Sequence, residues 1–126
     1  MAATILLVDD SPTILKMLEL GLRQAGYQVI TAQDGIDGLE KLKNQPVDLI
    51  VSDVNMPRMD GISFIAQVRQ QPENSHLPII VLSTEAQVRD RNMGMKAGAD
   101  LYLSKPVSQK DLVASIKDLL SQGNGA

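Results

Sequence analysis

Residues 5–10 read Ile-Leu-Leu-Val-Asp-Asp, and residues 49–53 read Leu-Ile-Val-Ser-Asp. Each stretch is a short apolar run that ends in carboxylates, a pattern typical of a strand that is buried on both faces. If the two runs form neighbouring parallel strands, the side chains of Asp9, Asp10 and Asp53 meet at one edge of the sheet. Two bare carboxylates about 5 Å apart repel by about 3 kcal/mol at an effective dielectric constant near 20. Such a cluster therefore favours a site for a hard divalent cation, which takes oxygen ligands.

The rest of the chain alternates short apolar runs with longer segments of helical periodicity. We expect strands at Thr4–Val8, Gln28–Thr31, Leu49–Ser52, Pro78–Leu82 and Leu101–Leu103, and helices at Pro12–Ala25, Ile36–Asn44, Ile62–Gln70, Gln87–Ala97 and Lys110–Ser121. Ser11, Asp60 and Ser108 suit helix N-caps, and Gly26 and Gly98 suit helix ends. Five βα units predict a doubly wound, five-stranded parallel sheet of the flavodoxin-like order 2-1-3-4-5, with helices on both faces.

Composition narrows the class of protein. The 126 residues fit one domain, residues 1–126, and a hydrophobic fraction of 44% is enough for a core. A net charge of −3 argues against a broad nucleic-acid surface, and the absence of cysteine excludes disulfides and thiolate chemistry. No apolar stretch approaches the length that crosses a bilayer, and Met1 lies just before a predicted strand. We therefore expect a cytoplasmic protein without membrane insertion.

The predicted strand order places the carboxylates where a ligand is expected, because open α/β sheets bind ligands where the strand order reverses. Asp10 and Asp53 can there bind Mg²⁺. Asp53 is the best candidate for a nucleophile, since a carboxylate can attack a phosphoryl group to give an aspartyl phosphate. Ser83 and Lys105 follow the fourth and fifth predicted strands, where they can donate to a phosphoryl oxygen and offset its charge.

Each of these residues also has a plainer explanation. Asp9 and Asp10 can simply begin a loop and cap a helix, and Asp53 can be a structural ligand that never reacts. Lys105 can be an ordinary surface lysine, and Ser83 a helix-cap serine. The coincidence of three carboxylates at one edge favours the functional interpretation.

Two further side chains stand out because their types are rare in this chain. Tyr102 is one of two tyrosines, and it is either a rotameric switch or an edge-strand residue that covers the core. His76 is the only histidine, and its polar surroundings predict a solvated loop residue rather than a metal ligand or a phosphohistidine.

Taken together, these residues resemble a known family. The pair Asp9-Asp10, the stretch Asp-Val-Asn-Met-Pro-Arg-Met-Asp-Gly at residues 53–61, Ser83 and Lys105-Pro106 resemble the receiver domain of two-component response regulators. The resemblance runs from Thr4 to about Leu120. The chain is most similar to stand-alone receivers of the chemotaxis type, and on this basis we expect no output domain.

The resemblance implies a phosphotransfer reaction. Asp53 would accept a phosphoryl group from a phosphohistidine of a partner histidine kinase, in the presence of Mg²⁺. The implied metal ligands are Asp10, the carboxylate of Asp53 and the backbone carbonyl of Asn55, with Asp9 acting largely through water. The protein would be a signalling domain and not an enzyme.

The resemblance also implies a conformational switch. Lys105 and Ser83 would contact the phosphoryl oxygens, Ser83 would move toward them, and Tyr102 would rotate inward. These changes would remodel the face formed by the fourth helix, fifth strand and fifth helix, to which a downstream protein would bind. The expected docking residues are Val88, Arg89, Arg91, Asn92, Met95 and Lys96. The chain itself would be a monomer or a phosphorylation-dependent dimer, with no direct contact to nucleic acid.

Three positions next to these groups are expected to set how long the phosphoryl group survives. Asn55 and Glu85 match family positions whose side chains tune this lifetime. Thr84 stands where the family commonly has Ala or Gly, so its bulk is expected to alter the rate of turnover. Val54 replaces an aromatic residue of some chemotaxis receivers, so metal binding should give no fluorescence signal.

Other functions fit the sequence less well. A phosphatase of the haloacid-dehalogenase type needs an acid/base Asp two residues after the nucleophile, where this chain has Asn55. A flavin-binding module of similar topology needs a hydroxyl- and glycine-rich loop after the first strand and aromatic side chains, which this chain lacks. A phosphorelay intermediate, a phosphate sink and a phosphorylation-independent interaction module of the same fold stay as alternatives.

Overall fold

The computed structural model describes residues 2–54, 59–84, 95, 97–105 and 107–124. Within these residues, one parallel sheet contains the strands β1 (Thr4–Val8), β2 (Gln28–Ala32), β3 (Leu49–Asp53), β4 (Ile79–Thr84) and β5 (Leu101–Lys105). The helices are α1 (Pro12–Gln24), α2 (Gly35–Asn44), α3 (Gly61–Gln70) and α5 (Gln109–Asn124). The strand order is β2-β1-β3-β4-β5, which confirms the predicted topology.

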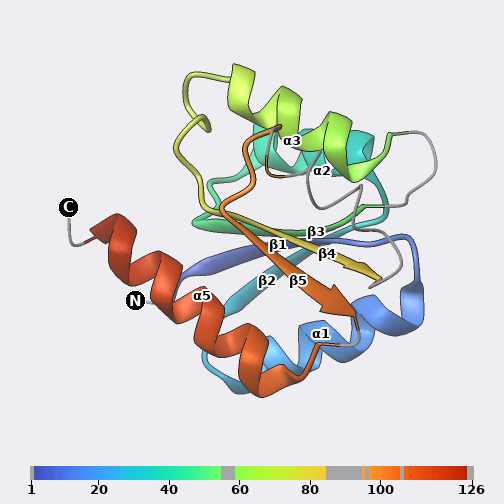
Figure 1. Ribbon diagram of the computed structural model, residues 1–126, viewed down its shortest axis with the longest axis vertical. Helices are drawn as coiled ribbons and strands as arrows, with labels where there is room; N and C mark the ends of the chain where they lie inside the picture. Colours follow the sequence, from blue (N-terminus) through green and yellow to red (C-terminus); the bar gives the residue numbers. More distant parts are fainter. Residues whose placement is uncertain (1, 55–58, 85–94, 96, 106, 125–126) are drawn as a thin grey trace.

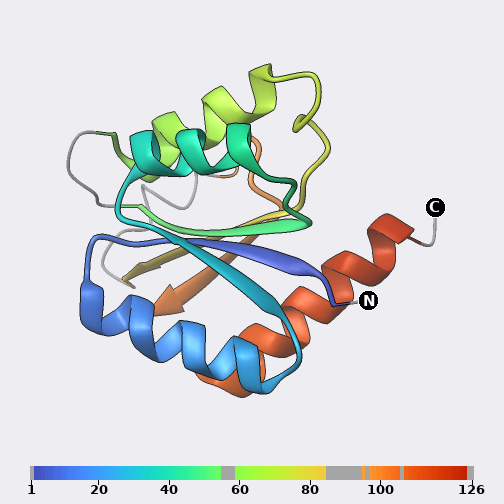
Figure 2. The same ribbon diagram turned by 180° about the vertical axis from the view of Figure 1, so that it is seen from behind.

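The sheet lies between two layers of helices. Helices α1 and α5 cover one face, and α2 and α3 cover the other (Figures 1 and 2). The helix expected at Gln87–Ala97 lies outside the described residues except for Met95 and Ala97. None of the described helices combines the length and the hydrophobicity that a membrane crossing requires.

Strands β2 to β5 extend further at their carboxyl ends than the sequence predicts. The pairing of β3 with β4 continues to Asp53, and that of β4 with β5 continues through Ser83 to Lys105. The apolar runs stop earlier, but the backbone ladder continues because pairing depends on main-chain groups and not on side-chain polarity. Asp53, Ser83 and Lys105 are therefore held by strands rather than by loops.

The predicted helix caps are confirmed where the structure describes them. The side chains of Ser11 and Asp60 accept hydrogen bonds from backbone N–H groups in the first turns of α1 and α3. The hydroxyl oxygen of Ser108 accepts one from the N–H of Asp111, at 3.0 Å. Gly26 and Gly98 have φ of 99° and 121°, a region that favours glycine. The predicted helix end at Gly26 is thus confirmed, whereas most of the helix expected before Gly98 lies outside the described residues.

An aliphatic core lies on each face of the sheet. Because side chains alternate along β1, Leu6 and Val8 pack toward α2 and α3, whereas Ile5 and Leu7 pack toward α1 and α5. The only phenylalanine, Phe64, is fully buried on α3. Full burial of about a dozen large aliphatic side chains is the main stabilising term, and it fixes the strands whose ends carry the polar cluster.

Candidate functional site

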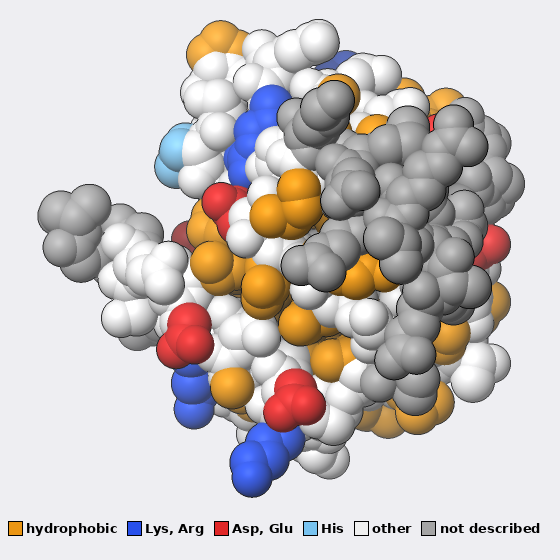
Figure 3. Space-filling model, viewed as in Figure 1, with side chains coloured by type: hydrophobic (Ala, Val, Ile, Leu, Met, Phe, Trp, Pro, Cys, Tyr) orange, Lys and Arg blue, Asp and Glu red, His pale blue; other side chains and the backbone are white. Residues whose placement is uncertain are grey.

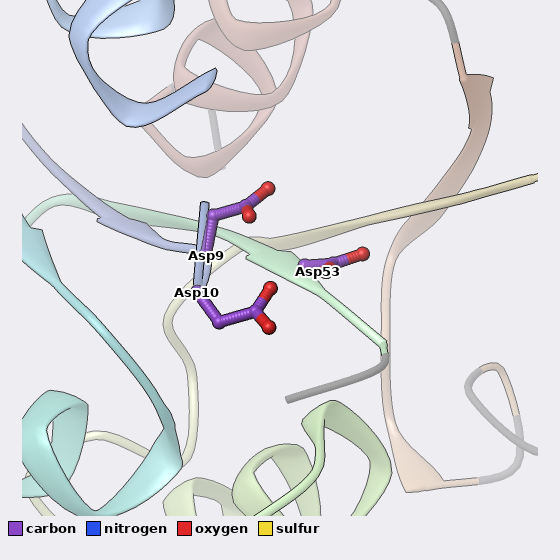
Figure 4. Close-up of side chains that lie close together, drawn as sticks. All are labelled: Asp9, Asp10 and Asp53. Carbon is purple, nitrogen blue, oxygen red and sulfur yellow. The ribbon is translucent and has the colours of Figure 1, made fainter. Parts of the chain in front are cut away.

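Three carboxylates converge at the carboxyl edge of the sheet (Figure 4). Asp53 is the last residue of β3, and Asp9 and Asp10 directly follow β1, which is paired with β3. One oxygen atom of each side chain lies within 4.8 Å of the others. Asp9 and Asp53 are buried, with 3% and 8% of their surfaces exposed, whereas Asp10 is exposed. The structure thus brings together the three residues that the sequence grouped.

A lysine ammonium reaches two of these carboxylates. Nζ of Lys105 lies 3.0 Å from Oδ1 of Asp53 and 3.2 Å from Oδ2 of Asp9. The side chain of Lys105 is only 20% exposed, so these ion pairs are partly shielded from water. Lys105 is therefore part of the cluster and not an ordinary surface lysine.

The electrostatics of the cluster are unbalanced. Burial raises the pKa of Asp53, and the nearby Asp9 raises it further, against the opposing effects of Lys105 and the backbone of Val54. Burial alone would lower the pKa of Lys105, but hydrogen bonds and charge attraction from Asp53 and Asp9 outweigh it, so that pKa is raised. Lys105 therefore stays charged, and within the part of the chain that the structure describes it is the ammonium that contacts this group of three carboxylates.

The two oxygens of Asp9 are already engaged within the protein. Oδ1 accepts a hydrogen bond from the N–H of Ser11 at 2.9 Å, and Oδ2 contacts Lys105. The N–H of Asp9 donates to the carbonyl of Ala32 at 3.1 Å, which fixes its backbone. The exposed Asp10 is therefore better placed than Asp9 to give an oxygen directly to a metal ion.

The donor set fits a small hard cation. It consists of carboxylate oxygens, and the exposure of Asp10 leaves room for the water molecules that Mg²⁺ retains. The donors include no sulfur, because the chain has no cysteine, and the three clustered side chains include no imidazole. Zinc and copper sites usually draw on such softer ligands.

Ser83 and Tyr102 lie on the two strands beyond β3. Ser83 is buried in β4, one residue beyond the position that pairs with Asp53, and its own partner in β5 is Ser104. Tyr102 is half-buried on the edge strand β5 and packs against the core that faces α2 and α3. This position agrees with a residue that covers the core, and the switch role stays a prediction.

Several predicted positions cannot be placed. Asn55, Glu85 and Pro106 lie outside the described residues, as does the side chain of Thr84. The same holds for the expected docking residues except Met95, which is exposed. His76 is exposed in the loop before β4, as expected. This loop leads into the amino end of β4, whereas the carboxylates lie at the carboxyl ends of the strands.

Sequence interpretation overlooked one residue next to Asp53. Gly61, the first residue of α3, donates its N–H to the carbonyl of Val54 at 2.8 Å and lies against the backbone of Asp53. In the sequence, Gly61 is the last residue of the stretch 53–61 that carries the family resemblance, and its local signal is its place directly after the N-cap Asp60. That signal indicates where a helix begins but not which backbone the helix meets.

Comparison with known proteins agrees with this geometry. The family model for the response regulator receiver domain matches residues 5–117. The transcriptional regulatory protein PrrA of Mycobacterium tuberculosis is 43% identical over 116 residues, which cover 92% of this chain and 49% of PrrA. This chain spans about half the length of the curated relatives that it matches first.

Two solved structures illustrate the likeness. Chemotaxis protein CheY4 of Vibrio cholerae superposes with a TM-score of 0.88 at 38% identity, covering 94% of this chain and 98% of CheY4. The receiver domain of sensor histidine kinase PA1611 from Pseudomonas aeruginosa superposes with a TM-score of 0.84 at 32% identity, covering 100% of both chains. In that structure a magnesium ion is coordinated in the active site cleft.

Proposed function

This chain belongs to the family of response regulator receiver domains, and from that premise we propose that residues 1–126 act as one receiver domain that is phosphorylated on Asp53. The observation that carries the proposal is the position of Asp53, buried at a strand end between two other carboxylates and an ammonium 3.0 Å away. A buried carboxylate beside fixed positive charge is suited to accept a phosphoryl group whose own charge must be offset.

The proposed donor is a phosphohistidine of a histidine kinase. An oxygen of the Asp53 carboxylate forms a bond to phosphorus as the bond between phosphorus and the donor imidazole breaks. The imidazole leaves with the electron pair of that bond and takes up a proton. The products are an aspartyl phosphate and a neutral histidine, so the reaction transfers a phosphoryl group without net hydrolysis.

The proposed cofactor is Mg²⁺, as the fit of the donor set indicates. Asp10 and the carboxylate of Asp53 would hold the ion, together with the backbone carbonyl of Asn55 that the family resemblance implies. Asp9 would act through water, which is consistent with the engagement of both its oxygens by Ser11 and Lys105. When bound, Mg²⁺ supplies positive charge that offsets the charge on the phosphoryl oxygens.

Lys105 and Ser83 are the proposed sensors of the phosphoryl group. Phosphorylation replaces the single negative charge of the Asp53 carboxylate by up to two on the phosphoryl group and brings strong acceptor oxygens next to the Lys105 ammonium, which can then exchange Asp53 for a phosphoryl oxygen. Ser83 on the adjacent strand β4 would donate its hydroxyl to a second oxygen. The two conformations need differ by only a few kcal/mol for this to shift the population.

The proposed output face includes β5 and α5. Strand β5 is one of the two edge strands of the sheet. Its residues Leu101, Tyr102 and Leu103 are only half-buried. In the view of Figure 3, hydrophobic side chains gather in the middle of the surface, beside α5. An inward rotation of Tyr102 would change this surface, and a downstream protein that prefers the changed surface would then bind.

Two kinds of downstream partner are proposed, from two relatives. The likeness to CheY4 supports a protein partner in chemotaxis or motility, and the likeness to PrrA supports control of transcription. The first predicts capture of a motility protein by the chain treated with beryllofluoride, and the second predicts that phosphorylation alters a DNA-binding output. A phosphorelay intermediate or a phosphate sink would instead pass on or hydrolyse its phosphoryl group without either effect.

The direct test of phosphorylation uses intact-protein mass spectrometry. Incubation with Mg²⁺ and acetyl phosphate should add the mass of one phosphoryl group to the wild type and to Asp118→Asn, a control at an exposed carboxylate of α5. The Asp53→Asn variant should gain none. A phosphorylated species of the same abundance in Asp53→Asn would show that Asp53 is not the acceptor. Phosphotransfer profiling against the histidine kinases of the source organism would then identify the donor.

A further inference from the structure

The first residue of α3 meets main-chain atoms at the end of β3. A Cβ atom at Gly61 would overlap the carbonyl oxygen of Asp53 and would lie 3.0 Å from Cα of Val54 and 3.1 Å from the carbonyl carbon of Asp53. The N–H of Gly61 donates to the carbonyl of Val54 at 2.8 Å. The space that a methyl group would need is therefore filled by main-chain atoms of the phosphoacceptor itself.

Both sides of this contact are held in place. The helix start is fixed by its cap, because the Asp60 carboxylate accepts the N–H of Ser63 at 2.8 Å, and by the buried Phe64 in the same turn. The strand end is fixed by pairing with β4 up to Asp53, whose carbonyl also accepts the hydroxyl of Ser52 at 2.9 Å. The three atoms nearest to an added methyl group all belong to the main chain, so none is the movable end of a side chain.

We propose that Gly61 is a positioning residue for Asp53, acting by its lack of a side chain. The start of α3 rests against the carbonyl of Asp53 and sets how far the Asp53 carboxylate extends toward Asp9, Asp10 and Lys105. The part of this inference that concerns metal rests on the function proposed above. The contact itself is independent of that function, because it involves only main-chain atoms.

A methyl group at Gly61 would displace the Asp53–Val54 peptide by roughly 1 Å to restore van der Waals separation. A displacement of that size matters for metal binding and phosphoryl transfer, because misplacement of reacting groups by about 1 Å can cost about 100-fold in rate. Loss of a group that orients a metal ligand typically weakens metal affinity by about 10- to 100-fold.

The test compares Gly61→Ala with Gly26→Ala. Gly26 lies at the end of α1, at the opposite edge of the sheet, with φ of 99° and no atom within 4 Å of an added Cβ. Both variants exchange glycine for alanine and lose stability, Gly26→Ala by backbone strain alone. The two readouts are the Mg²⁺ dissociation constant, measured by calorimetry, and the NMR shifts of the Asp53 carbonyl and the Val54 amide in metal-free protein.

We expect Gly61→Ala to bind Mg²⁺ about 10- to 100-fold more weakly than the wild type, with both NMR signals shifted before metal is added. Gly26→Ala should match the wild type in both readouts. A folded Gly61→Ala with wild-type affinity and unshifted signals would overturn the proposal. If this variant does not fold in buffer, trimethylamine N-oxide favours the folded state without removing the overlap, and both readouts apply there.

The two proposals can fail separately. If the wild type binds no Mg²⁺, the metal function fails, and the metal-free NMR shifts alone decide the role of Gly61. If the wild type binds Mg²⁺ and Gly61→Ala behaves like Gly26→Ala, the positioning role fails and the metal function stands.

Discussion

The ammonium of Lys105 lies 3.0 Å from the carboxylate of Asp53, although their strands are not neighbours in the sheet. Strand β4 separates β5 from β3, so the lysine side chain reaches across the end of β4 to Asp53. The same ammonium lies 3.2 Å from Asp9, beyond β1. One side chain thus connects the edge strand to both strand ends that carry carboxylates.

Removal of this ammonium should separate metal binding from signalling. We expect Lys105→Ala to bind Mg²⁺ as tightly as the wild type or more tightly, because the ammonium and the metal ion compete for the same carboxylates. After addition of beryllofluoride, however, the NMR signals of Ser83 and Tyr102 should stay near their resting positions. Lys110→Ala, which removes an exposed lysine on α5, should respond like the wild type. A wild-type response in Lys105→Ala would exclude Lys105 as a sensor.

Magnesium should stabilise the folded chain. A ligand that binds only the folded state raises the free energy of unfolding by about 2.7 kcal/mol at a concentration 100 times its dissociation constant. Urea unfolding followed by circular dichroism can measure this increase, which needs no tryptophan. Asp10→Asn should lose most of the increase because it removes an exposed carboxylate of the cluster, whereas Asp118→Asn should retain it. Equal stabilisation of both variants would place the bound metal elsewhere.

Asp53→Asn should change stability in opposite directions with and without metal. Without Mg²⁺ at neutral pH, we expect the variant to be more stable by roughly 1 kcal/mol, because it removes a buried negative charge that Asp9 repels and that Lys105 offsets only in part. With saturating Mg²⁺ the order should reverse, since only the wild type gains the full energy of metal binding. Unfolding curves of both proteins, with EDTA and with Mg²⁺, would measure the two free energies of unfolding. The same order of stability in both conditions would contradict this prediction.

A second cluster away from the carboxylates should matter for stability alone. The Arg69 guanidinium donates to the carbonyls of Leu77 at 2.6 Å and Gly98 at 2.7 Å, and to the carboxylate of Asp100 at 3.0 Å. We expect Arg69→Ala to lower the free energy of unfolding by about 2–3 kcal/mol, because part-buried carbonyls lose their donor. Arg69→Lys should recover little, since an ammonium cannot replace the planar fork.

Metal affinity distinguishes this cluster from the carboxylate site. Arg69 ties the end of α3 to the residues that lead into β5, at the opposite ends of the strands from the carboxylates. Both Arg69 variants should therefore bind Mg²⁺ with wild-type affinity while they are folded. A weaker affinity measured on the folded variants would show that this cluster also acts on the site.

The sequence was sufficient for the sheet and for the carboxylates because both follow from local patterns. Apolar runs ending in Asp predict buried parallel strands, and the order 2-1-3-4-5 then places Asp9, Asp10 and Asp53 together. Arg69 could not be predicted, because its acceptors Leu77 and Gly98 belong to segments whose approach depends on tertiary packing. From the sequence alone it is a basic residue near a helix end, and such residues are usually solvated.

The limits of prediction at the strand ends have the same origin. Hydrophobic patterns predicted that the third and fourth strands end at Ser52 and Leu82, but the ladder runs on to Asp53 and Thr84. Side-chain polarity does not report on main-chain pairing. The contact between Gly61 and Asp53 is likewise a main-chain contact, so no side-chain pattern indicated it.

Thr84 gives the last prediction, which concerns the lifetime of the phosphoryl group. Its backbone pairs with Lys105 at the end of β4, directly after Ser83, so the residue stands beside the proposed site. The family resemblance implies a smaller residue at this position, and a bulkier one is expected to hinder the water molecule that hydrolyses the aspartyl phosphate. Thr84→Ala should therefore lose its phosphoryl group faster, by about fivefold for a barrier lowered by about 1 kcal/mol.

The rate can be followed by intact-protein mass spectrometry after the phosphodonor is removed. Thr4→Ala, at the first residue of β1, removes the same atoms at the opposite ends of the strands and should decay like the wild type. A second comparison, Thr84→Val, keeps the bulk and removes the hydroxyl. It should decay as slowly as the wild type if bulk is the cause. Decay of Thr84→Ala at the wild-type rate or below would mean that water reaches the phosphoryl group by a path that Thr84 does not border.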